Sequence, residues 1–139
     1  LLNYLRLAER LKLLLGQDTR FLFVLGEQEV IERDQLEAMR RPEFSIAYCR
    51  SVPELSALML RARLIVANDC GPSDIAQGAC VPYVGVFNES NPEWFWDRPY
   101  SAAVVPRHPR DGINSVTPDD VLGACRKVLE HHAHPAYAG

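Results

Sequence analysis

Short apolar runs alternate with amphipathic segments along this chain. The first amphipathic segment, residues 2–15, places its leucines on one side of a helix, and Gly16 is positioned to end that helix. The run at 20–26 is almost continuously apolar and ends in glycine, which is typical of a parallel strand buried on both faces. Taken along the whole chain, the pattern predicts helices at 2–15, 27–39, 52–62, 74–79 and after 117, and strands at 20–26, 44–49, 64–67, 82–87 and 102–105.

Two of the predicted helix starts carry a specific signal. Ser51 and Glu54 have the spacing of a capping box, and Pro53 lies just inside the helix. Thr117 is placed to cap a last helix of about fifteen residues. Strands that alternate with helices predict an α/β fold, a Rossmann-like parallel sheet with flanking helices. A helix at the beginning is unusual for such a sheet, which normally opens with its central strand.

Composition narrows the class of protein. The 139 residues are enough for one domain with one core, and 47% apolar with 24% charged residues is ordinary globular composition. With a net charge of −3 the chain has no overall positive potential to attract a nucleic-acid backbone, so no nucleic-acid partner is predicted. No apolar run approaches the roughly 20 residues of a membrane span. The four cysteines form no CxxC pair, which indicates reduced thiols in a cytoplasmic protein.

Candidate chemistry lies beyond the carboxyl ends of the strands, where open parallel sheets bind their ligands. Three strand ends carry polar groups, at 26–29, 68–74 and 87–94. In the second, Gly71 allows close backbone approach, and Pro72 favours a first helical turn whose N–H groups at 73–75 would point at the mouth of the sheet. Such a turn is typical of a phosphate site. A plain strand-to-helix turn with Asp69 as N-cap is the alternative, and the spacing leaves both open.

The segment at 64–79 carries a resemblance to a known family. It reads LIVANDCGPSDIAQGA and leads into Val81 and Pro82. It resembles the signature of glycosyltransferase family 9, the heptosyltransferase group of lipopolysaccharide synthesis. In that family a strand rich in Val and Ile is followed by D-[ST]-G-x-x-H, a helix of small residues and a Val-Pro strand.

Two further segments match the family in the same order. Ser90, Asn91 and Pro92, with Trp94, fall where the family has a proline-containing loop that often holds a tryptophan. The segment at 26–29 falls where the family has a glycine at a strand end followed by glutamate. The resemblance covers residues 2–129.

The resemblance implies the carboxyl-terminal, donor-binding half of a GT-B enzyme, so residues 1–139 would form one nucleotide-sugar-binding domain. Asp69, Cys70 and Gly71 would then line the diphosphate and the sugar. Glu29 would hold the ribose hydroxyls; the alternative is a solvated glutamate that complements the helix dipole. The substrate-binding residues predicted in this way are Glu29, Asp69, Cys70, Gly71, Pro72, Ser73, Asp74, Ser90 and Trp94.

The sequence departs from the family pattern at two of these positions. Asp74 stands where the family has histidine, and a carboxylate there repels an anionic ligand by about 1 kcal/mol or more. Cys70 stands where the family has serine or threonine, and a thiol is the weaker donor.

One expected strand has no counterpart in the sequence. The usual strand order places a central strand between those at 20–26 and 64–67. A sheet with a central gap would leave backbone groups unsatisfied. We therefore expect a fragment of a longer protein, a strand supplied by a partner chain, or a rearranged sheet; the fragment is the favoured interpretation.

The implied reaction moves a sugar, heptose in the family's named members, from a nucleotide diphosphate to a glycan or lipopolysaccharide-type acceptor. The resemblance favours an ADP-sugar, and the acceptor would bring a cytoplasmic enzyme to the inner face of the membrane. No metal or other cofactor is predicted, because the chain has no DxD pair of carboxylates. The catalytic residues are expected in the absent amino-terminal domain. The alternative function is a non-catalytic Rossmann-like module that binds a nucleotide or a protein partner, with a degraded donor site.

Other features are less specific. Arg107, His108 and Arg110 form a small positive cluster that could meet phosphate in a donor site, but a solvated loop is the favoured interpretation. His131 and His134 could share one helix face, yet their terminal position favours a solvated end over a metal site. A hydrolase or phosphatase that uses Asp69 is a weaker alternative, since it would need a second carboxylate and a metal.

Overall fold

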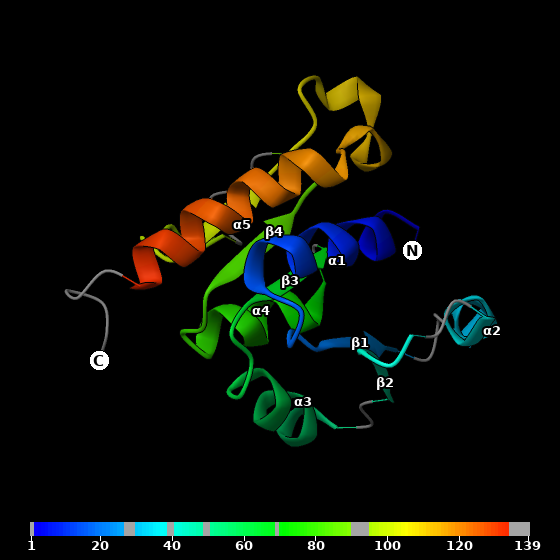
Figure 1. The fold of residues 1–139 in the computed structure, drawn as a ribbon. Coiled ribbons are helices and arrows are strands. Elements are labelled where there is room, and N and C mark those ends of the chain that lie inside the picture. The colour runs from blue at the N-terminus through cyan, green and yellow to red at the C-terminus, as the bar shows by residue number, and fades with distance from the viewer. Residues whose placement is uncertain are drawn as a thin grey trace. The chain divides into compact units, whose positions relative to one another are not determined.

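The computed structural model describes residues 2–26, 30–38, 41–48, 51–68, 70–89 and 95–133. The chain forms two compact units, Leu1–Leu55 and Ser56–Gly139. Helices and parallel strands alternate in the predicted order through both units (Figure 1). The α/β class, the parallel pairing and the flanking helices are therefore confirmed.

The first unit is built on two strands. Helix α1 (Leu2–Leu15) leads to β1 (Phe21–Leu25), and α2 (Val30–Ala38) connects β1 to β2 (Phe44–Tyr48). The two strands pair in parallel, with Phe21 opposite Phe44. Helix α1 ends as predicted at Gly16, which has φ +110° and donates its N–H to the Lys12 carbonyl over 3.0 Å.

One face of this small sheet makes the core of the first unit. Leu5 and Ala8 from α1 and Leu36 from α2 cluster with Leu25 and Phe44. The other face is open. Leu22 and Val24 are 46% and 42% exposed, so the prediction of a strand buried on both faces is wrong for β1. The physical reason is that α1 and α2 both contribute to the cluster on the Phe44 side of the sheet.

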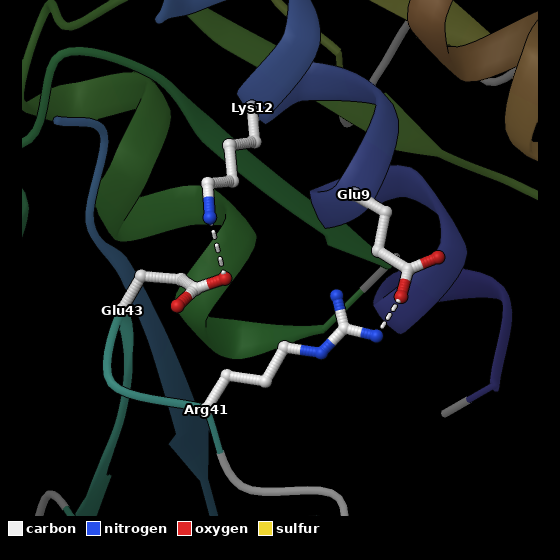
Figure 2. A network of polar contacts seen from close by, with 4 residues as sticks. All are labelled: Glu9, Lys12, Arg41 and Glu43. Atoms are coloured by element: carbon white, nitrogen blue, oxygen red, sulfur yellow. Dashed lines mark hydrogen bonds and ion pairs between the residues drawn. The ribbon is translucent and has the colours of Figure 1, made fainter. Parts of the chain in front are cut away.

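Two ion pairs connect α1 to the segment that precedes β2. The Lys12 ammonium lies 2.9 Å from a Glu43 carboxylate oxygen, and Arg41 pairs with Glu9 (Figure 2). The hydrogen bond from Lys12 is the main reason that the pKa of Glu43 lies below its ordinary value of 4.5. The charged form of Glu43 therefore favours the folded state.

We expect the stability of the protein to depend on pH through this pair. A depressed carboxyl pKa contributes stability that is present above the ordinary pKa and is lost as the pH falls through and below 4.5. On acidification the urea midpoint of the unaltered protein should fall. The urea midpoint of the variant Glu43→Gln should fall less, because this variant has no carboxyl group to protonate at position 43. Glu130→Gln, at an exposed position on the last helix, is the matched control. Parallel acid profiles for all three proteins would contradict the prediction.

The second unit holds a three-stranded parallel sheet in the order β3-β4-β5. Its elements are β3 (Ile65–Asn68), α4 (Gly71–Gly78), β4 (Tyr83–Val86), β5 (Ser101–Val104), the short 3-10 helices η2 (Pro109–Asp111) and η3 (Ile113–Ser115), and α5 (Pro118–Ala133). Helix α3 (Val52–Met59) spans the boundary between the two units. Among the described residues the strands thus form two parallel sheets, β1-β2 and β3-β4-β5.

The central strand β4 is buried along its whole length, with α5 packed on β4 and β5 and α4 against β3 and β4. Tyr83, Val84 and Cys125 are fully buried. Burial raises the pKa of the Cys125 thiol to about 12, so this cysteine is an inert core residue. Cys70, Cys80 and Cys125 are all free thiols, in agreement with the prediction, while Cys49 lies outside the described residues.

Candidate functional site

The carboxyl ends of β3, β4 and β5 meet at one edge of the sheet because the three strands are parallel. The chain leaves β3 into the first turn of α4 and leaves β5 into the two 3-10 helices, the yellow-to-orange segment before α5 in Figure 1. Beyond β4, Phe87 still donates its N–H to the Val104 carbonyl over 3.0 Å. The loops that follow β3 and β5 therefore lie on either side of the end of β4.

Helix α4 begins at this edge. Its N-cap residue is Cys70, in extended conformation with φ −162°, and the Cys70 side chain makes no capping hydrogen bond. Its sulfur lies 3.2 Å from the Asn68 carbonyl, so the thiol turns back toward β3. The cap position thus falls on Cys70, one residue after the predicted alternative, Asp69, which lies outside the described residues. A Cβ built on Gly71 would meet nothing within 4 Å, which leaves room beside the first turn.

Ser73 has a structural role in the same turn. Its N–H donates to the Cys70 carbonyl over 2.9 Å, and its hydroxyl shares a hydrogen bond with the Tyr83 hydroxyl. Ser73 is 1% exposed. The predicted free N–H at Ser73 is therefore wrong: the turn itself uses that donor.

The remaining predicted site residues divide into two sets. Pro72 and Asp74 lie in the first turn of α4, and both are exposed. The carboxylate of Asp74 complements the positive end of the helix dipole. The others, Glu29, Asp69, Ser90 and Trp94, lie outside the described residues, and their roles stay predictions.

The opposite end of α4 holds a cluster that the sequence analysis missed. The Arg98 guanidinium donates to the Gln77 carbonyl over 2.9 Å and lies 4.7 Å from the centre of the Trp96 ring. The backbone N–H of Trp96 donates to the side-chain oxygen of the buried Gln77 over 2.7 Å. Arg98 also donates to the Tyr100 hydroxyl. An arginine two residues from each of two aromatic residues is the sequence signal for this arrangement.

Two aromatic residues, Phe95 and Trp96, follow the predicted site residue Trp94 in the sequence. Phe95 packs edge-on against Phe87, with ring centres 6.0 Å apart, and Trp96 is held by Gln77 and Arg98. A shallow depression is lined by Gln77, Val81, Tyr83, Trp96, Arg98, Tyr100 and Ser101. Phe95 and Trp96 are therefore both in contact with other residues of the protein.

Helix α5 also begins at the carboxyl edge, with a reciprocal capping box. The Thr117 N–H donates to the Asp120 carboxylate over 2.9 Å, and the Asp120 N–H donates to the Thr117 hydroxyl over 3.2 Å. These bonds to Thr117 hold the pKa of Asp120 below its ordinary value. The predicted cap at Thr117 is confirmed.

None of the described helices is long and apolar enough to cross a membrane. Among the described residues, no group of three or more His, Cys, Asp or Glu side chains is placed to hold a metal ion.

Comparisons with known proteins agree with this architecture. A glycosyltransferase family 9 structure from Veillonella parvula DSM 2008 superposes with a TM-score of 0.72 at 17% identity. That match covers 92% of this chain and 40% of the other, so this chain spans well under half the length of the matched protein. A search of the curated proteins gave no match. The model of glycosyltransferase family 9 (heptosyltransferase) matches residues 6–108, across both sheets and α4, and the chain therefore belongs to that family.

Proposed function

We propose that this chain is the donor-binding domain of a glycosyltransferase, with a nucleotide-activated sugar bound at the carboxyl edge of β3, β4 and β5. The observation that carries the proposal is the first turn of α4, whose N-cap residue Cys70 makes no side-chain cap and which lies within the region matched by the family. A helix N-terminus presents N–H groups and positive partial charge, which suit a diphosphate. The open space beside Gly71 allows a ligand to approach the backbone.

The matched structure is much longer than this chain, which leaves room in a full-length protein for a second domain. We infer that residues 1–139 form the carboxyl-terminal nucleotide-sugar-binding domain of a two-domain protein. The acceptor site and the general base would lie in the other domain.

The reaction would be a direct displacement at the anomeric carbon of the sugar. A base removes the proton from the acceptor hydroxyl, the new glycosidic bond forms, and the bond to the diphosphate breaks. The first turn of α4 would stabilise the negative charge that develops on the leaving diphosphate. The same contacts hold the donor in place for attack.

The family resemblance extends the proposal to particular substrates. It favours an ADP-sugar, with heptose as the sugar and a glycan or lipopolysaccharide-type acceptor. The site of action would be the cytoplasm, at the inner face of the membrane where a lipid-linked acceptor lies.

A second candidate is a nucleotide- or partner-binding module without catalytic activity. It is favoured by two substitutions in the family motif: Asp74 in place of histidine, and Cys70 in place of serine or threonine. Asp74 adds negative charge where a diphosphate would bind, and a thiol donates weakly.

A titration of the ¹⁵N-labelled protein with ADP, UDP, GDP and an ADP-sugar tests the donor site. We expect chemical-shift changes at Gly71, Asp74 and Ile75, with one base preferred and with saturation below about 1 mM, the weak end of ordinary ligand affinity. The amides around Arg98, at the opposite end of α4, serve as the internal control. An Asp69→Ala variant should weaken the response. Unchanged spectra of the intact protein at millimolar ligand would contradict the donor site and favour the second candidate.

A further inference from the structure

The carboxyl edge of the second sheet is poor in positive charge. From Leu64 to Asp97 the sequence contains no lysine, arginine or histidine. The one basic residue between β4 and β5 is Arg98, whose guanidinium is bonded to the Gln77 carbonyl at the opposite end of α4. Asp74, in the first turn of α4, and Glu89, just after β4, are both acidic. A nucleotide diphosphate brings further negative charge to this edge. A cation from another loop would therefore strengthen its binding.

The loop after β5 supplies cations. Arg107, His108 and Arg110 are exposed there, and the Arg110 side chain is 84% accessible to solvent. The segments after β3 and β4 bring no basic residue to this edge, because their one arginine, Arg98, is bonded at the opposite end of α4. These arginines are therefore the strand-end cations available to an anionic ligand.

The backbone of this loop is held by its own hydrogen bonds. The Asp111 N–H donates to the His108 carbonyl over 3.0 Å, and the Ser115 hydroxyl donates to the Gly112 carbonyl over 2.7 Å. Gly112 turns the chain with φ +72°, a conformation that favours glycine. Pro106 is buried at the start of the loop, and Val116 is buried at its end. The loop thus presents its arginines from a fixed backbone.

The strand order brings this loop within reach of α4. Neighbouring strands lie about 4.8 Å apart, so the ends of β3 and β5 are separated by roughly 10 Å. An extended arginine side chain and a diphosphate together span a gap of that order. A guanidinium also matches two phosphate oxygens at once, which an ammonium does not.

Nearby carboxylates leave the guanidinium groups able to bind phosphate. Asp111 lies 4.0 Å from Arg110, beyond hydrogen-bond length. Asp120, which feels the charge of Arg107, already accepts the Thr117 N–H. Within the described ranges, no hydrogen bond from the Arg107 or Arg110 side chain is found.

We propose that Arg107 and Arg110 bind the diphosphate of the donor and supply the positive charge that the Asp74 position lacks. This inference rests on the proposed function, since it assigns two further residues to the same site. Arg107 lies near the end of the family match at residue 108, and Arg110 lies beyond it, so the assignment comes from the topology and charge of this chain.

The test measures calorimetric binding of ADP, UDP, GDP and inorganic pyrophosphate to the intact protein. Arg107→Gln and Arg110→Gln should each raise the Kd of the preferred nucleoside diphosphate about fivefold to tenfold. Each should also reduce the dependence of Kd on salt concentration. The matched control is Arg126→Gln, which removes the same charge from an exposed position eight residues into α5. All three sites are exposed, and thermal unfolding would verify that the variants are folded.

The outcomes separate the inference from the proposed function. Nucleoside diphosphate binding that is unchanged in both arginine variants overturns the arginine assignment and leaves the donor site standing. Arginine-dependent binding of pyrophosphate, with no preference for any nucleoside diphosphate, supports the arginine assignment and overturns the nucleotide donor. Absence of binding by every probe overturns both.

Discussion

Replacing Gly85 with alanine is expected to lower the free energy of unfolding by about 1–3 kcal/mol, the usual cost of overpacking a core. Gly85 lies in the middle of β4, between Tyr83 and Phe87 on the same face of the strand. A Cβ built there would come closer than 3.0 Å to the Phe87 ring and the Tyr83 hydroxyl. Phe87 is 2% exposed and Tyr83 is fully buried, so neither ring can move away without disturbing its neighbours.

Gly123 provides the matched control for this substitution. It lies within α5, and a Cβ there would meet nothing within 4 Å. Gly123→Ala should therefore raise the free energy of unfolding by about 0.5–1 kcal/mol through helix propensity alone. Urea unfolding followed by circular dichroism measures both variants. Equal and small effects of the two substitutions would show that the space around Gly85 is not tightly packed.

The Gly85 site also shows what sequence reasoning could not reach. The run at 82–87 predicted a strand, which is observed as β4. The sequence does not show which side chains contact one another across the core. The contact between Ser73 and Tyr83 joins residues from α4 and β4. It depends on how the helix packs on the sheet, which local patterns do not determine.

Helix ends were the most predictable features because their signals are local. The capping box of Ser51 and Glu54 appears as a 3.4 Å bond from the Glu54 N–H to the Ser51 hydroxyl. The cap at Thr117 and the glycine end at Gly16 were also predicted and are observed. Each involves residues three or four positions apart, so the chain specifies it without tertiary contacts.

At the candidate site the elements were predicted but not their details. The predicted strand and helix on either side of the segment 68–74 are observed as β3 and α4, and the site itself stays a prediction. The sequence did not show that Cys70, rather than Asp69, occupies the cap position. It also missed Arg98, whose partners lie 18 and 21 residues away at Cys80 and Gln77. Boundaries and long-range contacts are set by packing, and a one-residue shift changes which group caps a helix.

The start of α4, where the Cys70 side chain makes no cap, gives the second large prediction. Cys70→Asp should stabilise the unliganded protein and weaken nucleoside diphosphate binding. Pro72 has no N–H, so the carboxylate would accept from Ser73, and it would also complement the helix dipole. Replacing a residue that does not cap by one that does is worth about 0.5–2 kcal/mol, and the existing bond from the Ser73 N–H to the Cys70 carbonyl favours the lower end.

The loss of binding has a different cause, namely charge. A carboxylate about 4 Å from a phosphate oxygen costs about 1–4 kcal/mol between the limits of bulk water and a protein surface, which corresponds to at least about a fivefold rise in Kd. Cys70→Asn separates the two effects, because asparagine caps a helix without adding charge. Both variants should raise the urea midpoint, whereas only Cys70→Asp should raise the Kd at low salt, and added salt should reduce that difference. If binding were unchanged in both variants, the diphosphate could not lie at this end of α4. If both weakened it equally, the competition would be for the N–H groups of the first turn, and the charge of the new side chain would be irrelevant.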